Sequence, residues 1–116
     1  MNKIGDNDIK LSIGEKQLLC LCRALLTKSR IIILDEPYSN MDKNYENLLN
    51  NCINKYLSFS TLITISHKID SILNYDKIIV IDKGNIVEFD TPNNLISKED
   101  GLFRKYYLKY FYNNKN

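Results

Sequence analysis

The chain has 116 residues, of which 44% are hydrophobic, and its net charge is only +2. This size suits one compact domain rather than two. Acidic and basic residues are mixed along the chain, so no basic region indicates a nucleic-acid partner. No apolar run approaches the ~20 residues that cross a bilayer, and the first ten residues lack the apolar stretch of a signal peptide. We therefore expect the chain itself in an aqueous, cytosol-like space.

Four elements are predicted in the first half of the chain, after ten polar residues. Residues 12–28 predict a helix that is apolar on most sides and therefore well buried. Residues 30–37, RIIILDEP, predict a strand that is buried on both faces. Residues 39–59 predict a second helix, and residues 60–66 a second buried strand.

The second predicted helix has one apolar face. Spacings of one, three and four residues place on this face Leu48, Leu49, Cys52, Ile53, Tyr56 and Leu57. Its asparagines, around Asn47 and Asn50, are expected on a solvated face.

Five elements are predicted in the second half. Residues 67–76 predict a short helix and residues 77–82 a third strand, which a tight Lys-Gly-Asn turn joins to a strand at 86–90. Thr91 precedes a proline and suits a helix start. Residues 101–112 predict a last helix, whose aromatic side is expected to pack on the domain rather than to contact RNA or a membrane. That side consists of Leu102, Phe103, Tyr106, Tyr107, Tyr110 and Phe111.

Alternating strands and helices predict an α/β fold with a mostly parallel sheet flanked by helices on both faces, followed by a C-terminal hairpin and helix. Ligands of such sheets bind beyond the carboxyl ends of the strands. Asp35, Glu36 and His67 all fall at or just past such ends.

The three cysteines indicate no metal site. Cys20, Cys22 and Cys52 all lie in apolar helical patterns, so we expect buried thiols in a reducing compartment. Cys20 and Cys22 are two residues apart, which places them on different faces of a helix.

The stretch LSIGEKQ opens the first predicted helix. Ser12 and Glu15 fit a capping box, which satisfies free backbone N–H groups without any ligand. This interpretation leaves Gly14 unexplained. A glycine there would also let an anion approach the N-terminus of the helix, where the dipole favours negative charge.

Two adjacent carboxylates close the first predicted strand. A buried strand followed by a charged turn would explain them without function. Asp35 could alternatively hold Mg²⁺, a cation that prefers oxygen ligands and keeps several waters. Glu36 could take a proton from an attacking water, and Pro37 keeps Glu36 out of helical geometry.

His67 is the only histidine of the chain. It could be structural, or its imidazole could donate a hydrogen bond to a phosphate oxygen. Its place directly after the second predicted strand is compatible with the second role.

Together and in this order, LSIGEKQ, IIILDEP, SNMD and TLITISHK resemble the second half of an ABC-transporter nucleotide-binding domain. LSIGEKQ resembles the signature motif, IIILDE the Walker B strand, SNMD the D-loop, and His67 the switch histidine. GEKQLLCLCRALL, DKIIVIDKGNIVEFDTPNNLI and LFRKYY resemble most the multidrug-resistance-associated exporters. The resemblance implies the C-terminal half of a P-loop NTPase domain.

The resemblance also implies ATP and Mg²⁺ as ligands. Glu36 would activate the attacking water, His67 would contact the transferring phosphoryl group, and Asp35 would hold the metal. The residues that would serve nucleotide at the interface with a second, head-to-tail nucleotide-binding domain are Ser12, Gly14, Gln17 and Asp42.

The chain departs from the family pattern in two ways. Tyr38, Asn40 and Met41 stand where the family usually has threonine, alanine and leucine. The glycine loop GxxxxGK[ST] of the family's first half is missing. We therefore expect residues 1–116 to be a partial domain: a split product, a truncated gene model or a degraded gene.

The resemblance favours an exporter ATPase that works with transmembrane domains at the cytoplasmic face of a membrane. Two alternatives remain open at this point. One is a soluble ABC ATPase linked to DNA or ribosomes. The other is a non-catalytic fragment that completes a partner's ATP site.

Overall fold

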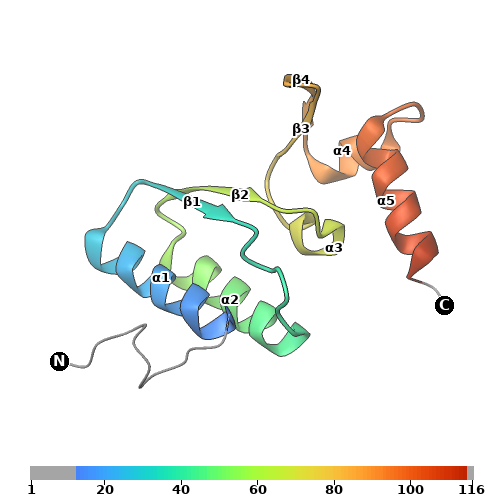
Figure 1. The fold of residues 1–116 in the computed structure, drawn as a ribbon. Helices are drawn as coiled ribbons and strands as arrows, with labels where there is room; N and C mark the ends of the chain where they lie inside the picture. Colours follow the sequence, from blue (N-terminus) through green and yellow to red (C-terminus); the bar gives the residue numbers. More distant parts are fainter. Residues whose placement is uncertain (1–12, 115–116) are drawn as a thin grey trace. The chain divides into compact units, whose positions relative to one another are not determined.

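The computed structural model describes residues 13–114 (Figure 1). All nine elements that the sequence predicts occur in this range. The chain divides into two compact units, Met1–Ser66 and His67–Asn116.

The first unit contains two helices and a parallel pair of strands. Its elements are α1 (Ile13–Thr27), β1 (Ile31–Asp35), α2 (Lys43–Tyr56) and β2 (Thr61–Ile65). The register of β1 and β2 runs in parallel and pairs Asp35 with Ile65 at its carboxyl end. This pairing confirms that the first two predicted strands are parallel neighbours, with α2 as the connection between them.

One face of this sheet packs on the two helices. α1 and α2 lie side by side, and side chains of both form one core with β1 (Figure 1). The buried residues of this core are Leu21, Ile32, Leu34, Tyr38, Met41, Leu49, Ile53 and Leu57.

The other face of the sheet is exposed in the part of the chain that the structure describes. Burial alternates along β1, because successive side chains of a strand point to opposite faces. The exposed face carries Ile31, Ile33, Ile63 and Ile65. The expectation that these strands are buried on both faces is therefore wrong for the described chain: helices cover only one face.

The expectation of a helix buried on most sides is also wrong for α1. Leu21 is buried, but Leu26 is 84% exposed, and Cys20 and Cys22 are exposed as well. Only the stripe of α1 that faces the core is covered, so the thiols of Cys20 and Cys22 are not the buried groups that we expected. Cys52, on α2, is half-buried.

The predicted apolar face of α2 is partly correct. Leu49 and Ile53 are buried, whereas Leu48 and Tyr56 are about half exposed. The buried stripe is instead completed by Glu46, which is turned toward the core one helical turn before Asn50.

The second unit contains a hairpin and three helices. Its elements are α3 (Ile69–Ile72), β3 (Ile78–Asp82), β4 (Asn85–Asp90), α4 (Pro92–Ser97) and α5 (Leu102–Asn113). β3 and β4 pair antiparallel, with an irregularity in register between Val80 and Ile81. The parallel sheet expected to include a third strand is thus limited, among the described residues, to β1 and β2.

The turn accounts for the antiparallel pairing of β3 with β4. Lys83 and Gly84 both have positive φ, 50° and 79°, as a two-residue type I′ hairpin turn requires. This turn joins β3 directly to β4, so a partner for β3 is available next to it in the chain.

The core of the second unit is small. Ile78, Val80, Leu95 and Phe103 are buried together. Leu102 and Tyr107 pack against this cluster, as predicted for the aromatic side of α5, but Tyr106 and Phe111 are exposed. Thr91 caps α4 by accepting a hydrogen bond from the backbone N–H of Asn94, which confirms the predicted helix start.

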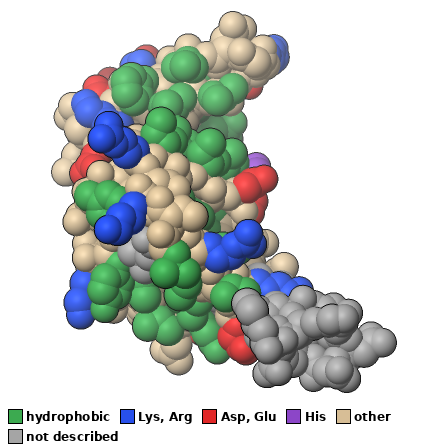
Figure 2. Space-filling view, turned by 90° about the vertical axis from the view of Figure 1, so that its left-hand side faces the viewer, with side chains coloured by type: hydrophobic (Ala, Val, Ile, Leu, Met, Phe, Trp, Pro, Cys, Tyr) green, Lys and Arg blue, Asp and Glu red, His purple; other side chains and the backbone are tan. Residues whose placement is uncertain are grey.

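Apolar side chains are exposed over much of the face shown in Figure 2. Within residues 13–114, no helix combines the length and the apolar character needed to span a bilayer.

Candidate functional site

The candidate site lies at the carboxyl end of β1. Asp35 is the last residue of β1 and its side chain is exposed. The backbone N–H of Glu36 donates a hydrogen bond to the carbonyl oxygen of Ile65, with 2.7 Å between nitrogen and oxygen. The sheet therefore continues for one residue beyond β1 and fixes the backbone position of Glu36.

Glu36 has an unusual backbone conformation. Its φ is 49°, in the left-handed region, which costs a non-glycine residue about 1–3 kcal/mol. Pro37 follows and is buried. Pro37 is expected to keep Glu36 out of helical geometry, and this φ does lie outside the right-handed helical region. It also lies outside the extended region that a residue before proline favours, so Pro37 alone does not account for the angle. Backbone strain of this kind persists only where the surroundings hold the residue, and it gathers at functional sites.

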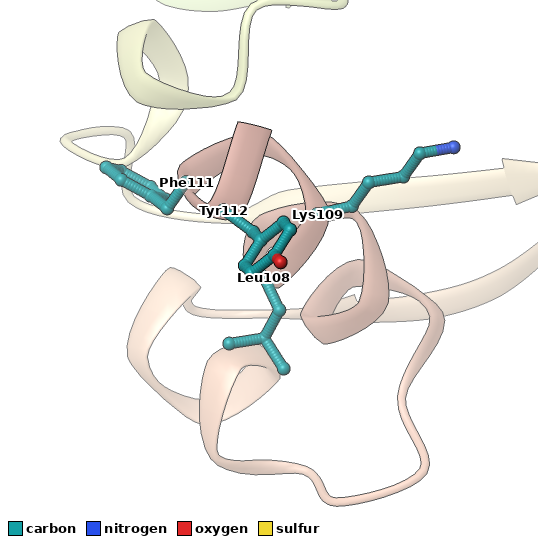
Figure 3. Close-up of a pocket in the computed structure, with 4 residues that line it drawn as sticks. All are labelled: Leu108, Lys109, Phe111 and Tyr112. Atoms are coloured by element: carbon teal, nitrogen blue, oxygen red, sulfur yellow. The ribbon is translucent and has the colours of Figure 1, made fainter. Parts of the chain in front are cut away.

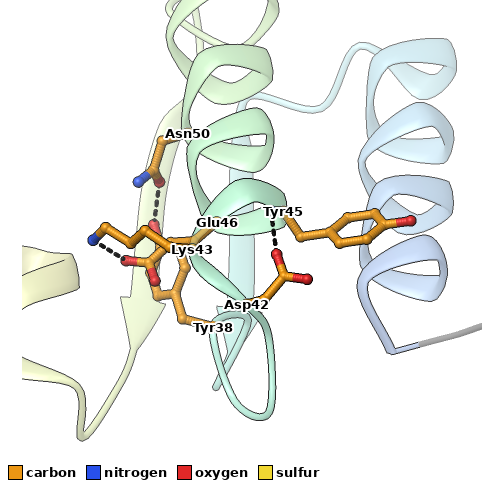
Figure 4. Close-up of polar contacts among 6 residues, drawn as sticks. All are labelled: Tyr38, Asp42, Lys43, Tyr45, Glu46 and Asn50. Carbon is orange, nitrogen blue, oxygen red and sulfur yellow. Dashed lines mark hydrogen bonds and ion pairs between the residues drawn. The ribbon is translucent and has the colours of Figure 1, made fainter.

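The turn after Glu36 is tied to α2. The side chain of Tyr38 is 1% exposed, and its hydroxyl donates a hydrogen bond to Oδ1 of Asn50 at 2.7 Å (Figure 4). Within the turn, the N–H of Ser39 donates to the carbonyl oxygen of Glu36 at 3.2 Å.

Asp42 begins α2. Its Oδ1 accepts a hydrogen bond from the backbone N–H of Tyr45 at 2.9 Å, so Asp42 is the N-cap of this helix (Figure 4). One turn later, Oε1 of the buried Glu46 lies 3.6 Å from Nζ of the exposed Lys43. A capping role accounts for the presence of Asp42 without a ligand, and a contact with nucleotide stays a prediction.

The remaining predicted residues are spread over the chain. Gly14 and Gln17 lie in the first two turns of α1, whereas Ser12 lies outside the described residues. His67 is exposed and lies in the second unit, two residues after β2. The structure thus brings Asp35, Glu36 and Asp42 into one strand–turn–helix segment, and the pairing of Glu36 with His67 stays a prediction.

The donor chemistry of this segment fits a magnesium nucleotide in part. Asp35 presents an exposed carboxylate at a strand end, and Mg²⁺ uses one or two protein carboxylates together with waters and phosphate oxygens. Within residues 13–114, no group of three or more His, Cys, Asp or Glu side chains is placed to hold a metal by itself. Any Mg²⁺ here would therefore need phosphate oxygens as further ligands.

Two open hollows elsewhere on the surface contain none of the predicted residues. One, of about 450 Å³, lies on α5 and is lined by Leu108, Lys109, Phe111 and Tyr112 (Figure 3). The other, of about 720 Å³, is lined by Lys28, Arg30, Phe59 and Thr61. Both are shallow and exposed, and the second lies at the opposite end of β1 from Asp35.

Sequence reasoning missed the role of Asn50. We expected Asn50 on a solvated face, but it is half-buried and accepts the hydrogen bond of Tyr38. A signal was present: Asn50 follows Glu46 by four residues and precedes Ile53 by three, so it shares the buried side of α2 with both.

The chain is similar to ABC transporters in sequence. A family model described as "ABC transporter" matches residues 1–39. Bile pigment transporter 1 of Saccharomyces cerevisiae is 43% identical over 101 residues, which are 87% of this chain and 6% of the relative. ATP-binding cassette sub-family C member 3 of Homo sapiens is 44% identical over 99 residues, 85% of this chain and 6% of that protein. The chain therefore spans only a small part of the curated relatives that it matches.

A solved structure supports the same relationship. The structure described as a bacterial Atm1-family ABC exporter with ATP bound is 29% identical and has a TM-score of 0.80. The match covers 94% of this chain and 19% of that one. Both the described α/β fold and the sequence are thus similar to one part of an ABC exporter.

Proposed function

We propose that this chain, which is similar in sequence and fold to part of the ABC transporters, forms the C-terminal half of a nucleotide-binding domain that hydrolyses ATP to drive export. The observation that carries the proposal is the geometry of Glu36. A glutamate whose backbone is held at the carboxyl end of a parallel strand, by a sheet hydrogen bond and in a strained conformation, is positioned for chemistry.

In this proposal Glu36 is the general base that orients and deprotonates the attacking water. Asp35 would hold the metal through its exposed carboxylate, and His67 would donate a hydrogen bond to the transferring phosphoryl group. Bound Mg²⁺ would neutralise the charge on the phosphates. Phosphoryl transfer depends mostly on such positioning and electrostatics.

The proposed ATP site also needs residues from a second nucleotide-binding domain. Two domains would meet head to tail, and the start of α1 of one would cover the nucleotide held by the other. Free backbone N–H groups and the helix dipole would favour the negative phosphate there. The residues that would take part are Ser12, Gly14 and Gln17 around the start of α1, together with Asp42 at the start of α2.

The proposed location is the cytoplasmic face of a membrane, where the chain would be attached to transmembrane domains; no helix within residues 13–114 could span the membrane itself. Its support is the similarity to proteins whose names describe transporters and an exporter. The sequence of β3, β4 and α4 also favours a transporter over a soluble ABC ATPase, because it resembles the segment that follows the histidine in exporters.

The proposal can be tested in a transporter fusion, in which residues 1–116 replace the matching segment of the yeast bile pigment transporter. Glu36→Gln keeps the size and polarity of the side chain but removes the base. We expect this variant to retain bound ATP and to hydrolyse it at least about 100-fold more slowly than the unchanged fusion.

The matched control is Glu99→Gln, which changes an exposed glutamate after α4. It should leave ATP turnover unchanged. Equal turnover of the Glu36→Gln variant and the unchanged fusion would remove Glu36 from the role of base.

A further inference from the structure

We propose that Tyr38 and Asn50 are positioning residues for Glu36, an inference that rests on the proposed ATPase function. Tyr38 stands where the family usually has threonine, so the family pattern does not assign it a role. Its hydrogen bond to Asn50 joins the turn after β1 to the middle of α2 (Figure 4).

Glu36 is held from two sides. On one side, its N–H donates to the carbonyl oxygen of Ile65 in β2 at 2.7 Å. On the other side, the buried pair Pro37 and Tyr38 packs into the core, and the Tyr38 hydroxyl is bonded to α2. A left-handed glutamate persists only where its surroundings over-determine its conformation. These two anchors meet that condition.

The hydrogen bond of Tyr38 fixes the direction of its side chain, which hydrophobic packing alone does not do. The ring of Tyr38 buries apolar surface wherever it lies in the core. The 2.7 Å hydrogen bond adds a fixed point at the far end of the side chain, twelve residues along the chain on a rigid helix. The turn also closes on itself, since Met41 N–H donates to the Tyr38 carbonyl oxygen at 3.4 Å.

Loss of this fixed point would leave the fold in place but loosen Glu36. Tyr38→Phe keeps the ring and its packing and removes only the hydroxyl. A small misplacement of a catalytic group lowers the rate much more than it lowers binding. Tyr38 would therefore affect the chemical step through Glu36, without touching ATP itself.

The test measures kcat and KM for ATP in the transporter fusion. We expect Tyr38→Phe to lower kcat about tenfold, with KM changed less than about twofold. Tyr56→Phe, at a half-exposed tyrosine on α2, is the matched control and should change neither. A merely structural role would lower the active fraction, which also lowers the apparent kcat without changing KM, so kcat is expressed per ATP-binding fusion molecule and should then be unchanged in that case.

Asn50→Ala removes the acceptor of the same hydrogen bond and should lower kcat by a similar factor. Because both variants break one bond, the double variant should lose no more than either single one. Asn51→Ala, at an exposed position next in α2, is the control. An unchanged kcat of Tyr38→Phe, or losses that multiply in the double variant, would overturn the inference.

A second measurement separates this inference from the proposed function. Hydrogen exchange of the Glu36 amide reports the ordering of the turn whether or not ATP is hydrolysed. Tyr38→Phe should speed this exchange about tenfold, and unchanged exchange would refute the anchoring role. Inactivity of the unchanged fusion, or full activity of Glu36→Gln, would instead refute the ATPase proposal.

Discussion

At the residue scale, Glu88 shows how one buried carboxylate can join two elements. It lies on β4 and is 8% exposed. Its Oε1 accepts a hydrogen bond from the backbone N–H of Phe103 at 2.8 Å, and Nζ of Lys98 lies 3.4 Å from Oε2. Gly101, the N-cap of α5, makes no side-chain cap, so Glu88 satisfies this free N–H group of the helix instead.

Replacing Glu88 by Ala is therefore expected to loosen the start of α5. The buried N–H of Phe103 would lose its acceptor, which costs about 1–3 kcal/mol. Hydrogen exchange of the Phe103 amide in the transporter fusion measures this loss, with Glu99→Ala as the exposed control. Equal protection in both variants would show that Glu88 does not hold the helix.

The position of the Glu88 carboxylate also requires a residue without a side chain at Gly101. A Cβ at this position would lie 2.9 Å from Oε2 of Glu88 and 3.1 Å from the carbonyl oxygen of Lys98. Glycine thus lets the carboxylate approach the helix. No sequence pattern indicated this contact, because Glu88 and Gly101 are thirteen residues apart and lie in different elements.

Asp90 gives a prediction on pH dependence. Two hydrogen bonds lower the pKa of Asp90 below its usual 3.8. The larger effect comes from the Asn94 side chain, and the smaller from the backbone N–H of Thr91. The ionised form is thus favoured by folding. Its stabilising effect is complete above the unfolded pKa and is lost as the pH falls through the lower folded pKa.

Asn94→Ala should raise the pKa of Asp90 back toward 3.8, because the strongest of these hydrogen bonds is removed. The carboxyl carbon shift of Asp90 in an NMR titration follows its pKa directly. Asn93→Ala, at the neighbouring exposed residue, should leave the titration unchanged. An Asp90 midpoint at or above 3.8 in the unchanged chain would contradict the prediction.

At the element scale, the sequence predicts the kind and order of all elements within the described residues. Hydrophobic period and turn residues are local signals, and they placed β1, α2, β2 and the β3–β4 hairpin correctly. Burial could not be predicted in the same way. The same β-branched run suits a strand covered on two faces or on one, because the run itself does not reveal what packs on it.

The same contrast applies to the candidate site: its position in the chain could be predicted, but its contacts in space could not. The sequence predicts that Asp35 and Glu36 follow a strand, and this is where they lie. The left-handed φ of Glu36 and the bond between Tyr38 and Asn50 depend on contacts between a turn and a distant helix turn. Residue spacing alone does not contain those contacts.

Two substitutions in the hairpin turn are expected to change the stability of the hairpin in opposite directions. Gly84→Ala should destabilise the hairpin by about 1 kcal/mol, because a left-handed alanine is strained although nothing lies within 4 Å of its Cβ. Lys83→Asn should stabilise it by a few tenths of a kcal/mol, since Asn-Gly is the preferred pair for this turn.

Hydrogen exchange of the β3 and β4 amides tests both expectations. Relative to the unchanged fusion, exchange should be faster in Gly84→Ala and slower in Lys83→Asn. Lys105→Asn, at an exposed lysine on α5, controls for the loss of a positive charge. Slower exchange in Gly84→Ala than in the unchanged protein would show that this turn does not require a left-handed residue.

At the scale of the whole molecule, the exposed sheet face is the main feature to explain. Ile33 and Ile63 are register partners on this face, and Ile33 is 64% exposed. Large contiguous apolar surfaces are rare on soluble monomers. We therefore expect the isolated 116 residues to be poorly soluble or molten, and a sharp cooperative melt of the isolated chain would contradict this.

Ile33→Lys should act in opposite directions in the isolated chain and in the fusion. In the isolated chain the charge meets water, so the soluble fraction after centrifugation should rise and dye binding to apolar surface should fall. In the transporter fusion, the proposed remainder of the domain would cover this face. An unpaired buried lysine is costly there, so ATP turnover should fall at least tenfold.

Leu26→Lys is the matched control, because Leu26 is exposed on α1 and away from the sheet. It should raise solubility slightly and leave the fusion active. If Ile33→Lys leaves the fusion fully active, the face is not covered in the complete domain. In that case the expectation that further parts of the domain pack on this face is wrong.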